Sequence, residues 1–268
     1  MTTARDIAPP TGKLGVLMPG LGAVASTVIA GVLHSRRTGE DPLGSVAQMA
    51  HIRLGKREEN RNPRIKEFVP LAELDDLVFG GWDPLSPNAL EAAQTAGVMK
   101  PEDLAAISGD LEGVVAMDAV FDQRWVSRIE GVRVKTQTNK FEQAEALIAD
   151  IEQFRIENNC DRLVIVWCGS TEAYQEPSAV HDSIESFEQG LRDNDDNISP
   201  SQIYAYAALQ SGVPFANGAP NLTTDVPCIE ELSKREGVPI AGKDFKTCLL
   251  YTSPSPRDRT RSRMPSSA

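Results

Sequence analysis

A glycine-rich turn near the start of the chain, between a short apolar run and a helix of small residues, most constrains the fold. The run Leu14–Met18 predicts a buried strand, and G-x-G-x-x-A follows it at residues 20, 22 and 25. Gly20 permits a tight turn, Gly22 lets a backbone approach a pyrophosphate, and Ala25 keeps the helix close to the strand. A helix beginning near residue 23 would present free N–H groups to an anion. The turn indicates a phosphate-binding site, with packing alone as its other interpretation.

Composition narrows the class of protein. The 268 residues are 41% hydrophobic and 24% charged, which is typical of a folded globular protein of one large domain or two modest ones. No apolar run reaches the roughly 18 residues that span a bilayer, and the first dozen residues lack a secretory signal, so we expect a cytoplasmic protein. A net charge of −11 argues against nucleic acid or an anionic membrane as a partner. Scattered cysteines and three histidines predict neither disulfides nor a metal site.

A carboxylate for a ribose hydroxyl is expected after the second strand. Glu40 and Asp41 lie about 20 residues beyond the glycines, but they belong to a polar turn with no predicted strand before it. The next predicted strand, Leu74–Phe79, runs into a turn that contains Asp83 and Pro84. Asp83 therefore lies at the edge where doubly wound sheets bind ligands, and closing the turn is its alternative role.

The rest of the chain alternates helical and extended segments. Helices are predicted over 88–96, 140–158, 200–211 and 230–235, and extended segments over 162–167, 213–215 and 238–241. Small or polar turns follow the extended segments at 168–172, 217–221 and 242–247. This alternation predicts an α/β fold with a doubly wound sheet whose turns converge on one edge. A cationic cluster within residues 44–67 is interpreted as a solvated loop, the alternative being contact with phosphate or a neighbouring subunit.

An ordered series of motifs supports this interpretation as a nucleotide-binding α/β fold over most of the chain. The motifs are GLGAVAST (20–27), IRLGKREENR (52–61), VFGGWD (78–83), CDRLVIVWCGSTE (160–172), YAYAA (204–208), GVPFANGAPNLT (212–223) and GKDFKT (242–247). Together they closely resemble inositol-phosphate synthases, in the bacterial branch that is similar to the eukaryotic enzyme. The resemblance implies an NAD-binding, Rossmann-like doubly wound sheet.

The resemblance also implies an activity. It is the NAD-dependent isomerisation of D-glucose 6-phosphate to 1D-myo-inositol 3-phosphate by oxidation, enolisation, intramolecular aldol cyclisation and reduction, without net consumption of NAD. Cationic side chains facing the developing oxyanions would supply much of the catalysis. A homotetrameric parent protein is implied as well. A conventional NAD-dependent dehydrogenase and a non-catalytic nucleotide-binding module are the alternatives.

The motifs assign roles residue by residue. The predicted cofactor-binding residues are Gly20, Gly22, Ala23, Val24, Ala25, Asp83, Cys168, Gly169, Ser170, Thr171, Gly218, Ala219, Asp244 and Thr247, and the predicted catalytic residue is Lys246. Val24 and Ala25 stand where the eukaryotic pattern has two asparagines, so only backbone contacts are expected there.

The chain departs from the family after Thr247, where the family continues with Gly-Gln-Thr and a long further segment. Here residues 248–268 carry four arginines in a Ser- and Pro-rich run, which we interpret as a disordered tail arising from adaptor read-through, with a basic interaction tail as the alternative. We expect an N-terminal extension over 1–12 and the NAD-binding domain over 13–247. We expect the parent gene to encode the synthase, and this chain to be inactive and prone to aggregation through exposed sheet edges.

Overall fold

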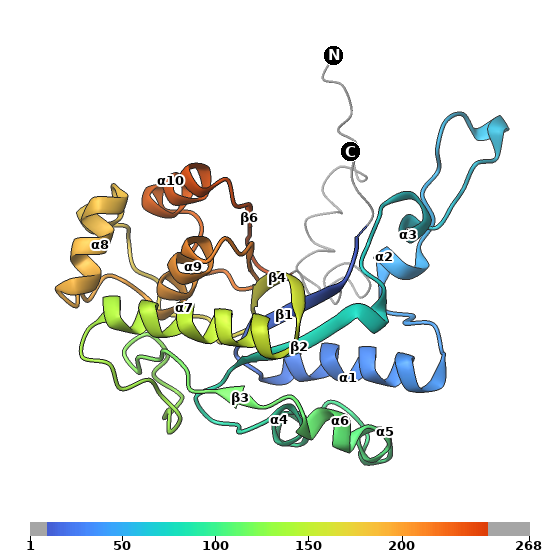
Figure 1. Cartoon of the computed structure of the whole chain (residues 1–268), viewed down its shortest axis with the longest axis horizontal. Helices are drawn as coiled ribbons and strands as arrows, with labels where there is room; N and C mark the ends of the chain where they lie inside the picture. The colour runs from blue at the N-terminus through green and yellow to red at the C-terminus, as the bar shows by residue number, and fades with distance from the viewer. Residues whose placement is uncertain (1–9, 246–268) are drawn as a thin grey trace, which may run out of the picture.

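The chain folds around a six-stranded parallel sheet with the strand order β3-β2-β1-β4-β5-β6, seen in the computed structural model, which describes residues 10–245 (Figure 1). The strands are β1 (Lys13–Pro19), β2 (Leu77–Trp82), β3 (Ala116–Met117), β4 (Cys160–Trp167), β5 (Phe215–Asn217) and β6 (Ile240–Ala241). Every neighbouring pair is parallel. This order is that of a doubly wound dinucleotide-binding sheet, so the predicted fold class is confirmed.

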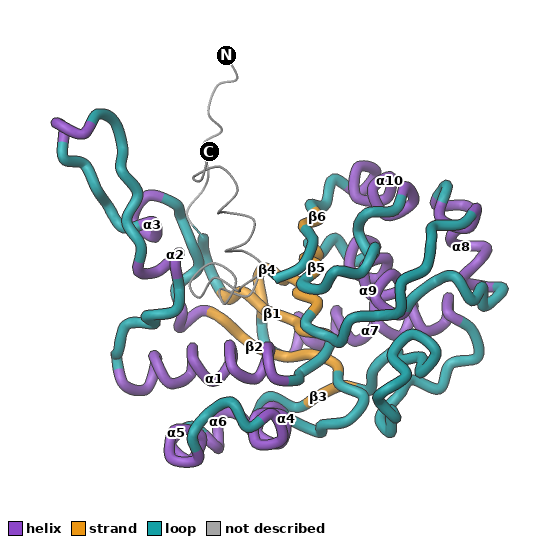
Figure 2. The backbone as a smooth tube through the Cα atoms, turned by 180° about the vertical axis from the view of Figure 1, so that it is seen from behind, coloured by secondary structure: helices purple, strands orange, loops and turns teal. Residues whose placement is uncertain are grey.

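Helices cover the two faces of the sheet (Figures 1 and 2). One face carries α1 (Ala23–Thr38), α4 (Ala89–Ala96), α5 (Pro101–Ala106) and α6 (Ser108–Glu112), and the other carries α7 (Lys140–Glu157), α8 (Ile184–Arg192), α9 (Pro200–Gln210) and α10 (Pro227–Glu236). Because successive side chains of a strand point to opposite faces, Leu17 of β1 belongs to the α7–α9 core and Met18 to the α1–α4 core. Short helices α2 (Val46–Met49) and α3 (Ile65–Phe68) lie in the connection before β2.

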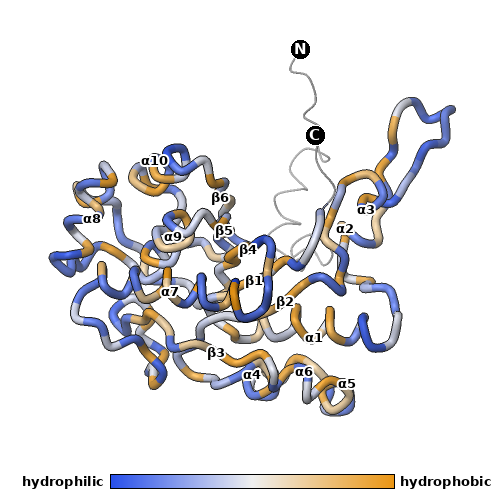
Figure 3. The backbone as a smooth tube through the Cα atoms, in the orientation of Figure 1, coloured by the Kyte–Doolittle hydropathy of each residue, from blue (hydrophilic) through white to orange (hydrophobic). Residues whose placement is uncertain are grey.

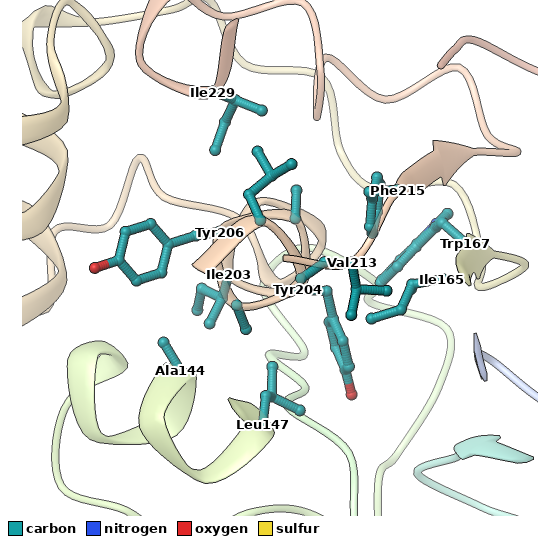
Figure 4. Close-up of a cluster of buried hydrophobic side chains, with 14 of the residues drawn as sticks. Ala144, Leu147, Ile165, Trp167, Ile203, Tyr204, Tyr206, Val213, Phe215 and Ile229 are labelled. Carbon is teal, nitrogen blue, oxygen red and sulfur yellow. The ribbon is translucent and has the colours of Figure 1, made fainter. Parts of the chain in front are cut away.

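Helix α9 is buried on all sides. Every residue from Pro200 to Leu209 is buried, so α9 packs around its whole circumference and not through a single apolar face. The reason is the number of neighbours: in Figure 4, Leu147 of α7, Ile229 of α10 and Phe215 of β5 surround it. A helix enclosed in this way fixes the position of its N-terminus relative to the sheet.

Local signals placed most element boundaries. The predicted helix at 88–96 is confirmed: the Asn88 side chain accepts a hydrogen bond from the Glu91 N–H, and Gly97 ends the helix in the left-handed region. The strand predicted from Leu74 is wrong at its start, since residues 74–76 form a 3-10 turn and β2 begins at Leu77. The Arg36 guanidinium donates hydrogen bonds to the carbonyls of Leu74 in this turn and of Leu77 at the start of β2, which holds both against α1.

The cationic cluster forms an arm between α1 and β2 that projects from the body of the molecule. Two antiparallel β-bridges, His51 with Arg64 and Leu54 with Arg61, pair the outgoing and returning segments of the arm. The tip of the arm is the 3-10 turn Arg57–Glu59. Hydrophilic residues cover much of the arm (Figure 3), in agreement with the interpretation as a solvated loop. Among the described residues, no helix has both the length and the apolar composition to cross a bilayer.

Candidate dinucleotide site

The carboxyl ends of β1, β2 and β4 open into a cleft of about 410 Å³. Its walls come from the turns after these strands, from the segment that follows β3, and from the start of α9. The lining residues are Pro19, Gly20, Gly22, Ala23, Val24, Trp82, Asp83, Pro84, Leu85, Ala119, Val120, Phe121, Val126, Ile129, Trp167, Cys168, Gly169, Ser170, Thr171, Glu172, Pro200 and Tyr204. The cleft lies where doubly wound sheets bind ligands.

Gly20 brings the turns after β1 and β4 into backbone contact. It adopts a φ of +85°, and a Cβ there would lie 2.4 Å from Gly169 Cα and 2.6 Å from Gly169 N. The Gly20 N–H donates to the Trp82 carbonyl at 2.8 Å, and the Cys168 N–H donates to the Pro19 carbonyl at 3.0 Å. Only glycine fits this position, because it must accept both the left-handed backbone and the close approach.

The N-terminus of α1 faces the cleft without a side-chain cap. Gly22 is its N-cap, it supplies no side-chain cap for the free N–H groups, and the first turn holds no acidic residue. The first N–H groups of an α-helix lack intrahelical partners, and the helix dipole favours an anion beside them. A Cβ at Gly22 would meet nothing within 4 Å, so the space beside these N–H groups is open. Ala25, one turn on, is fully buried in the α1–α4 core instead.

Asp83 lies in the cleft wall at the end of β2 and is 6% exposed. Its Oδ1 accepts hydrogen bonds from the Leu85 N–H at 2.8 Å and the Ser86 N–H at 2.7 Å. The turn-closing role is therefore present in the structure. The ribose contact stays a prediction, and the position of Asp83 at the edge of the cleft is compatible with it.

Three aromatic rings form a rigid wall of the cleft. Tyr204 of α9 lies between Trp82 and Trp167, with ring centroids 5.3 and 5.6 Å away and edge-to-face geometry in both pairs. The Trp82 Nε1 donates to Asp150 Oδ2 at 2.7 Å, which fixes the indole. Burial raises the pKa of Tyr204, so its hydroxyl remains neutral.

Glu172 also lines the cleft, although its sequence motif predicts no role for it. Its Oε1 accepts a hydrogen bond from the Ser201 N–H at 2.8 Å, its Oε2 accepts one from the Ser201 hydroxyl at 2.5 Å, and its own N–H donates to Asn221 Oδ1 at 2.9 Å. Burial raises the pKa of Glu172 to about 7, against the opposing effect of these donors. The signal that singled out Asp83, a carboxylate just past the end of a strand, applies equally to Glu172.

A second group of predicted residues meets beyond the end of β5. The Gly218 N–H donates to the Trp167 carbonyl at 3.1 Å, the Phe245 N–H to the Gly218 carbonyl at 3.0 Å, and the Asp244 N–H to the Ala219 carbonyl at 3.2 Å. The segment that carries Asp244 thus packs beside the turns after β4 and β5, outside the lining of the cleft. Lys246 and Thr247 lie outside the described residues.

Nine of the predicted cofactor-binding residues line one cleft: Gly20, Gly22, Ala23, Val24, Asp83, Cys168, Gly169, Ser170 and Thr171. Among the described residues that line it, the carboxylates are Asp83 and Glu172, and no lysine, arginine or histidine is present. An anion in this cleft would therefore be held by backbone N–H groups. In the part of the chain that the structure describes, no three His, Cys, Asp or Glu residues cluster to hold a metal.

Comparison with known proteins agrees with this geometry. The NAD-binding family model described as myo-inositol-1-phosphate synthase matches residues 14–254. Inositol-3-phosphate synthase 1 of Bacteroides thetaiotaomicron is 44% identical over 261 residues, covering 96% of this chain and 60% of the relative. Isozyme 1 of the synthase from Arabidopsis thaliana is 32% identical, covering 90% of this chain and 50% of the relative.

A solved structure is similar over the same region. The crystal structure of inositol-3-phosphate synthase from Caenorhabditis elegans superposes with a TM-score of 0.81 at 28% identity, covering 88% of this chain and 50% of that one. The chain thus spans between half and three fifths of the length of these relatives. Because the family model matches well over half of its residues, the chain belongs to the myo-inositol-1-phosphate synthase family.

Proposed function

We propose that the chain binds NAD in the cleft and that the protein to which it belongs converts D-glucose 6-phosphate to 1D-myo-inositol 3-phosphate. The observation that carries the proposal is the uncapped N-terminus of α1, beside the glycine contact of residues 20 and 169. Backbone N–H donors at the start of a helix can bind a pyrophosphate. The carboxylates and the apolar walls of the cleft cannot, because they offer no donor to an anion.

The two halves of a doubly wound sheet bind the two halves of a dinucleotide. Asp83, at the end of β2, would hold the adenosine ribose. The N–H groups of residues 22–24 would hold the pyrophosphate, and the turn Cys168–Thr171 would lie along the nicotinamide half. The residues of the aromatic wall would exclude water from the reacting end of the cleft.

NAD would supply reversible hydride transfer, so that the sugar is oxidised, rearranged and reduced again. The chain's part is to keep the cofactor bound throughout and to offer cations to oxyanions of the sugar. The described lining residues contain no cation, so that task falls to Lys246 and to other residues of the whole protein.

The relatives named inositol-3-phosphate synthase support this function over a conventional dehydrogenase or a nucleotide-binding module. The test compares residues 1–268 with a version extended by the C-terminal part of the Bacteroides relative. We expect the extended version to form inositol phosphate from glucose 6-phosphate while NADH absorbance stays flat, and residues 1–268 to form none. Steady production of NADH would favour the dehydrogenase, and NAD binding without product by the folded, extended version would favour the binding module.

The oligomeric state of the whole protein belongs to the same proposal. We expect the extended version to be a homotetramer, and light scattering coupled to size exclusion would measure its mass. A monomer with full activity would contradict this part of the proposal.

A further inference from the structure

Glu172 separates two cavities. It and Thr171 line both the cleft and a smaller cavity of about 190 Å³, which reaches toward His181, Gln202 and Asn221. Glu172 is 7% exposed, and the function proposed above gives it no role. A buried ionisable group at the wall of a binding cleft is costly to keep, which calls for an explanation.

The surroundings of Glu172 stabilise its ionised form through hydrogen bonds alone. Ser201, whose N–H and hydroxyl both donate to the carboxylate, is the second residue of the eleven-residue helix α9. The hydroxyls of Ser199 and Thr223 lie 3.0 and 2.7 Å from the Ser201 hydroxyl and complete the network. Among the ion pairs of the described residues, none includes Glu172.

Glu172 is the carboxylate that lines the cleft on the β4 side, while Asp244 packs beside the turns after β4 and β5 but outside the lining. The other titratable groups that line the two cavities are Asp83, Cys168 and Tyr204 in the cleft and Tyr174 and His181 in the smaller cavity. Asp83 is at the end of β2, on the far side of β1 from β4. His181 is tied by Nδ1 to the Ser178 N–H at 3.1 Å, and its Nε2 lies 3.2 Å from Gln202 Oε1.

The two redox forms of NAD differ in charge where the nicotinamide binds. The oxidised ring is cationic and the reduced ring is neutral, while the rest of the molecule is the same. If Asp83 holds the adenosine ribose, the nicotinamide half lies toward the ends of β4 and β5, where Glu172 is. A buried carboxylate there attracts the oxidised ring more strongly than the reduced one, because the low local dielectric leaves the charge poorly screened.

We propose that Glu172 sets the preference of the cleft for oxidised over reduced NAD. The inference rests on the proposed NAD binding and adds to it the residue that distinguishes the two forms. It also gives the buried carboxylate a function. An enzyme that returns its hydride to the sugar must bind both NAD⁺ and NADH, and the charge of one carboxylate can adjust the ratio of the two affinities. The pKa of about 7 makes the preference depend on pH near neutrality, since the carboxylate ionises over that range.

The test measures the dissociation constants of NAD⁺ and NADH for residues 1–268 and for Glu172→Gln, by calorimetry at about pH 6 and about pH 8. For the unmodified chain we expect the preference for NAD⁺ to rise by about fivefold to tenfold between these pH values. In Glu172→Gln, which keeps the side-chain shape and one acceptor oxygen, the preference should be low and independent of pH. Asp83→Asn is the matched control, and it should weaken both forms by the same factor.

Ser201→Ala provides a second variant in which the carboxylate stays. Loss of the hydroxyl donor should raise the pKa of Glu172, so the rise in NAD⁺ preference should move to higher pH. A merely structural role predicts something else: both variants would weaken NAD⁺ and NADH equally at every pH, and that result would overturn the inference. Absence of binding of either form to the folded, unmodified chain would instead refute the proposed function.

Discussion

The hydroxyl of Tyr204 accepts a hydrogen bond from the backbone N–H of Val120 at 3.0 Å, across 84 residues of sequence. This contact joins α9, in which every residue from Pro200 to Leu209 is buried, to the segment that follows β3. Tyr204 also packs edge-to-face on Trp82 and Trp167. One side chain therefore contacts the end of β2, the end of β4 and the segment after β3, and fixes their relative positions.

Tyr204→Phe removes the hydroxyl and leaves the buried Val120 N–H without its acceptor. We expect the free energy of unfolding to fall by about 1–3 kcal/mol, because an unsatisfied buried donor bears its full desolvation cost. Urea denaturation followed by tryptophan fluorescence would measure it. Tyr206→Phe is the matched control on the same helix: its hydroxyl donates to Glu188, whose carboxylate reaches water, so the loss should be smaller. Equal losses of unfolding free energy in the two variants would show that the hydrogen bond to Val120 stabilises the fold no more than the bond to Glu188 does.

Gly20 and Gly22 both belong to the turn motif, but a side chain would be excluded at the two positions for different reasons. Gly20→Ala forces a Cβ against Gly169 and strains a φ of +85°, so we expect a loss of about 1–3 kcal/mol in stability together with loss of NAD binding. Gly22→Ala meets no protein atom and should leave stability within about 0.5 kcal/mol, yet weaken NAD at least tenfold by occupying the space beside the helix start. Thermal unfolding and NAD titration of both variants would separate the effects. Unchanged NAD affinity in Gly22→Ala would contradict the pyrophosphate position.

Asp83 has a structural and a proposed binding role that two substitutions can separate. Asp83→Asn keeps an oxygen that can accept from the Leu85 and Ser86 N–H groups, so the turn and the stability should survive while NAD affinity falls about tenfold. Asp83→Ala should lower stability as well, by about 1–2 kcal/mol. Calorimetric NAD titrations would be paired with unfolding curves. Full NAD affinity in a folded Asp83→Asn would leave the turn as the only role of this residue.

The raised pKa of Glu172 has a consequence for stability. In the folded chain this carboxyl holds its proton up to about pH 7, whereas in the unfolded chain it loses it near the ordinary value of 4.5. Between these values the folded state binds more protons, so stability falls as pH rises, by up to roughly 3 kcal/mol from this residue. The difference in unfolding free energy between Glu172→Gln and the unmodified chain should therefore grow in favour of the variant over that interval. A difference independent of pH would mean that Glu172 titrates at its ordinary pKa in the folded chain.

Interactions between near neighbours in sequence were predictable. The turn at Gly20 and the helix over 88–96 each depend on a few adjacent residues, and both are confirmed. The alternation of strands and helices fixed the parallel sheet because a βαβ connection has few alternatives. The motif residues of 168–171 lie in the cleft with the glycine turn for the same reason: both follow adjacent strands.

Contacts between distant segments were not predictable from local patterns. The enclosure of α9 depends on α7, α10 and β5, which come from distant parts of the chain. The bond from Ser201 to Glu172 joins a residue of α9 to one in the turn after β4, 29 positions away. The side chain of Tyr204 reads as one more apolar position in a helix until its hydroxyl meets Val120. Such contacts arise from packing, which hydrophobic periodicity does not specify.

On the function proposed here, the cleft at the ends of β1, β2 and β4 holds NAD by the backbone N–H groups at the start of α1. Calorimetric titration of NAD⁺ into residues 1–268 and into Gly22→Ala, with folding of both checked by circular dichroism, tests it most directly. We expect one NAD⁺ per chain for the unmodified protein and binding at least tenfold weaker for the variant. Absence of NAD⁺ binding by the folded, unmodified chain, or equal affinity in the two proteins, would contradict it.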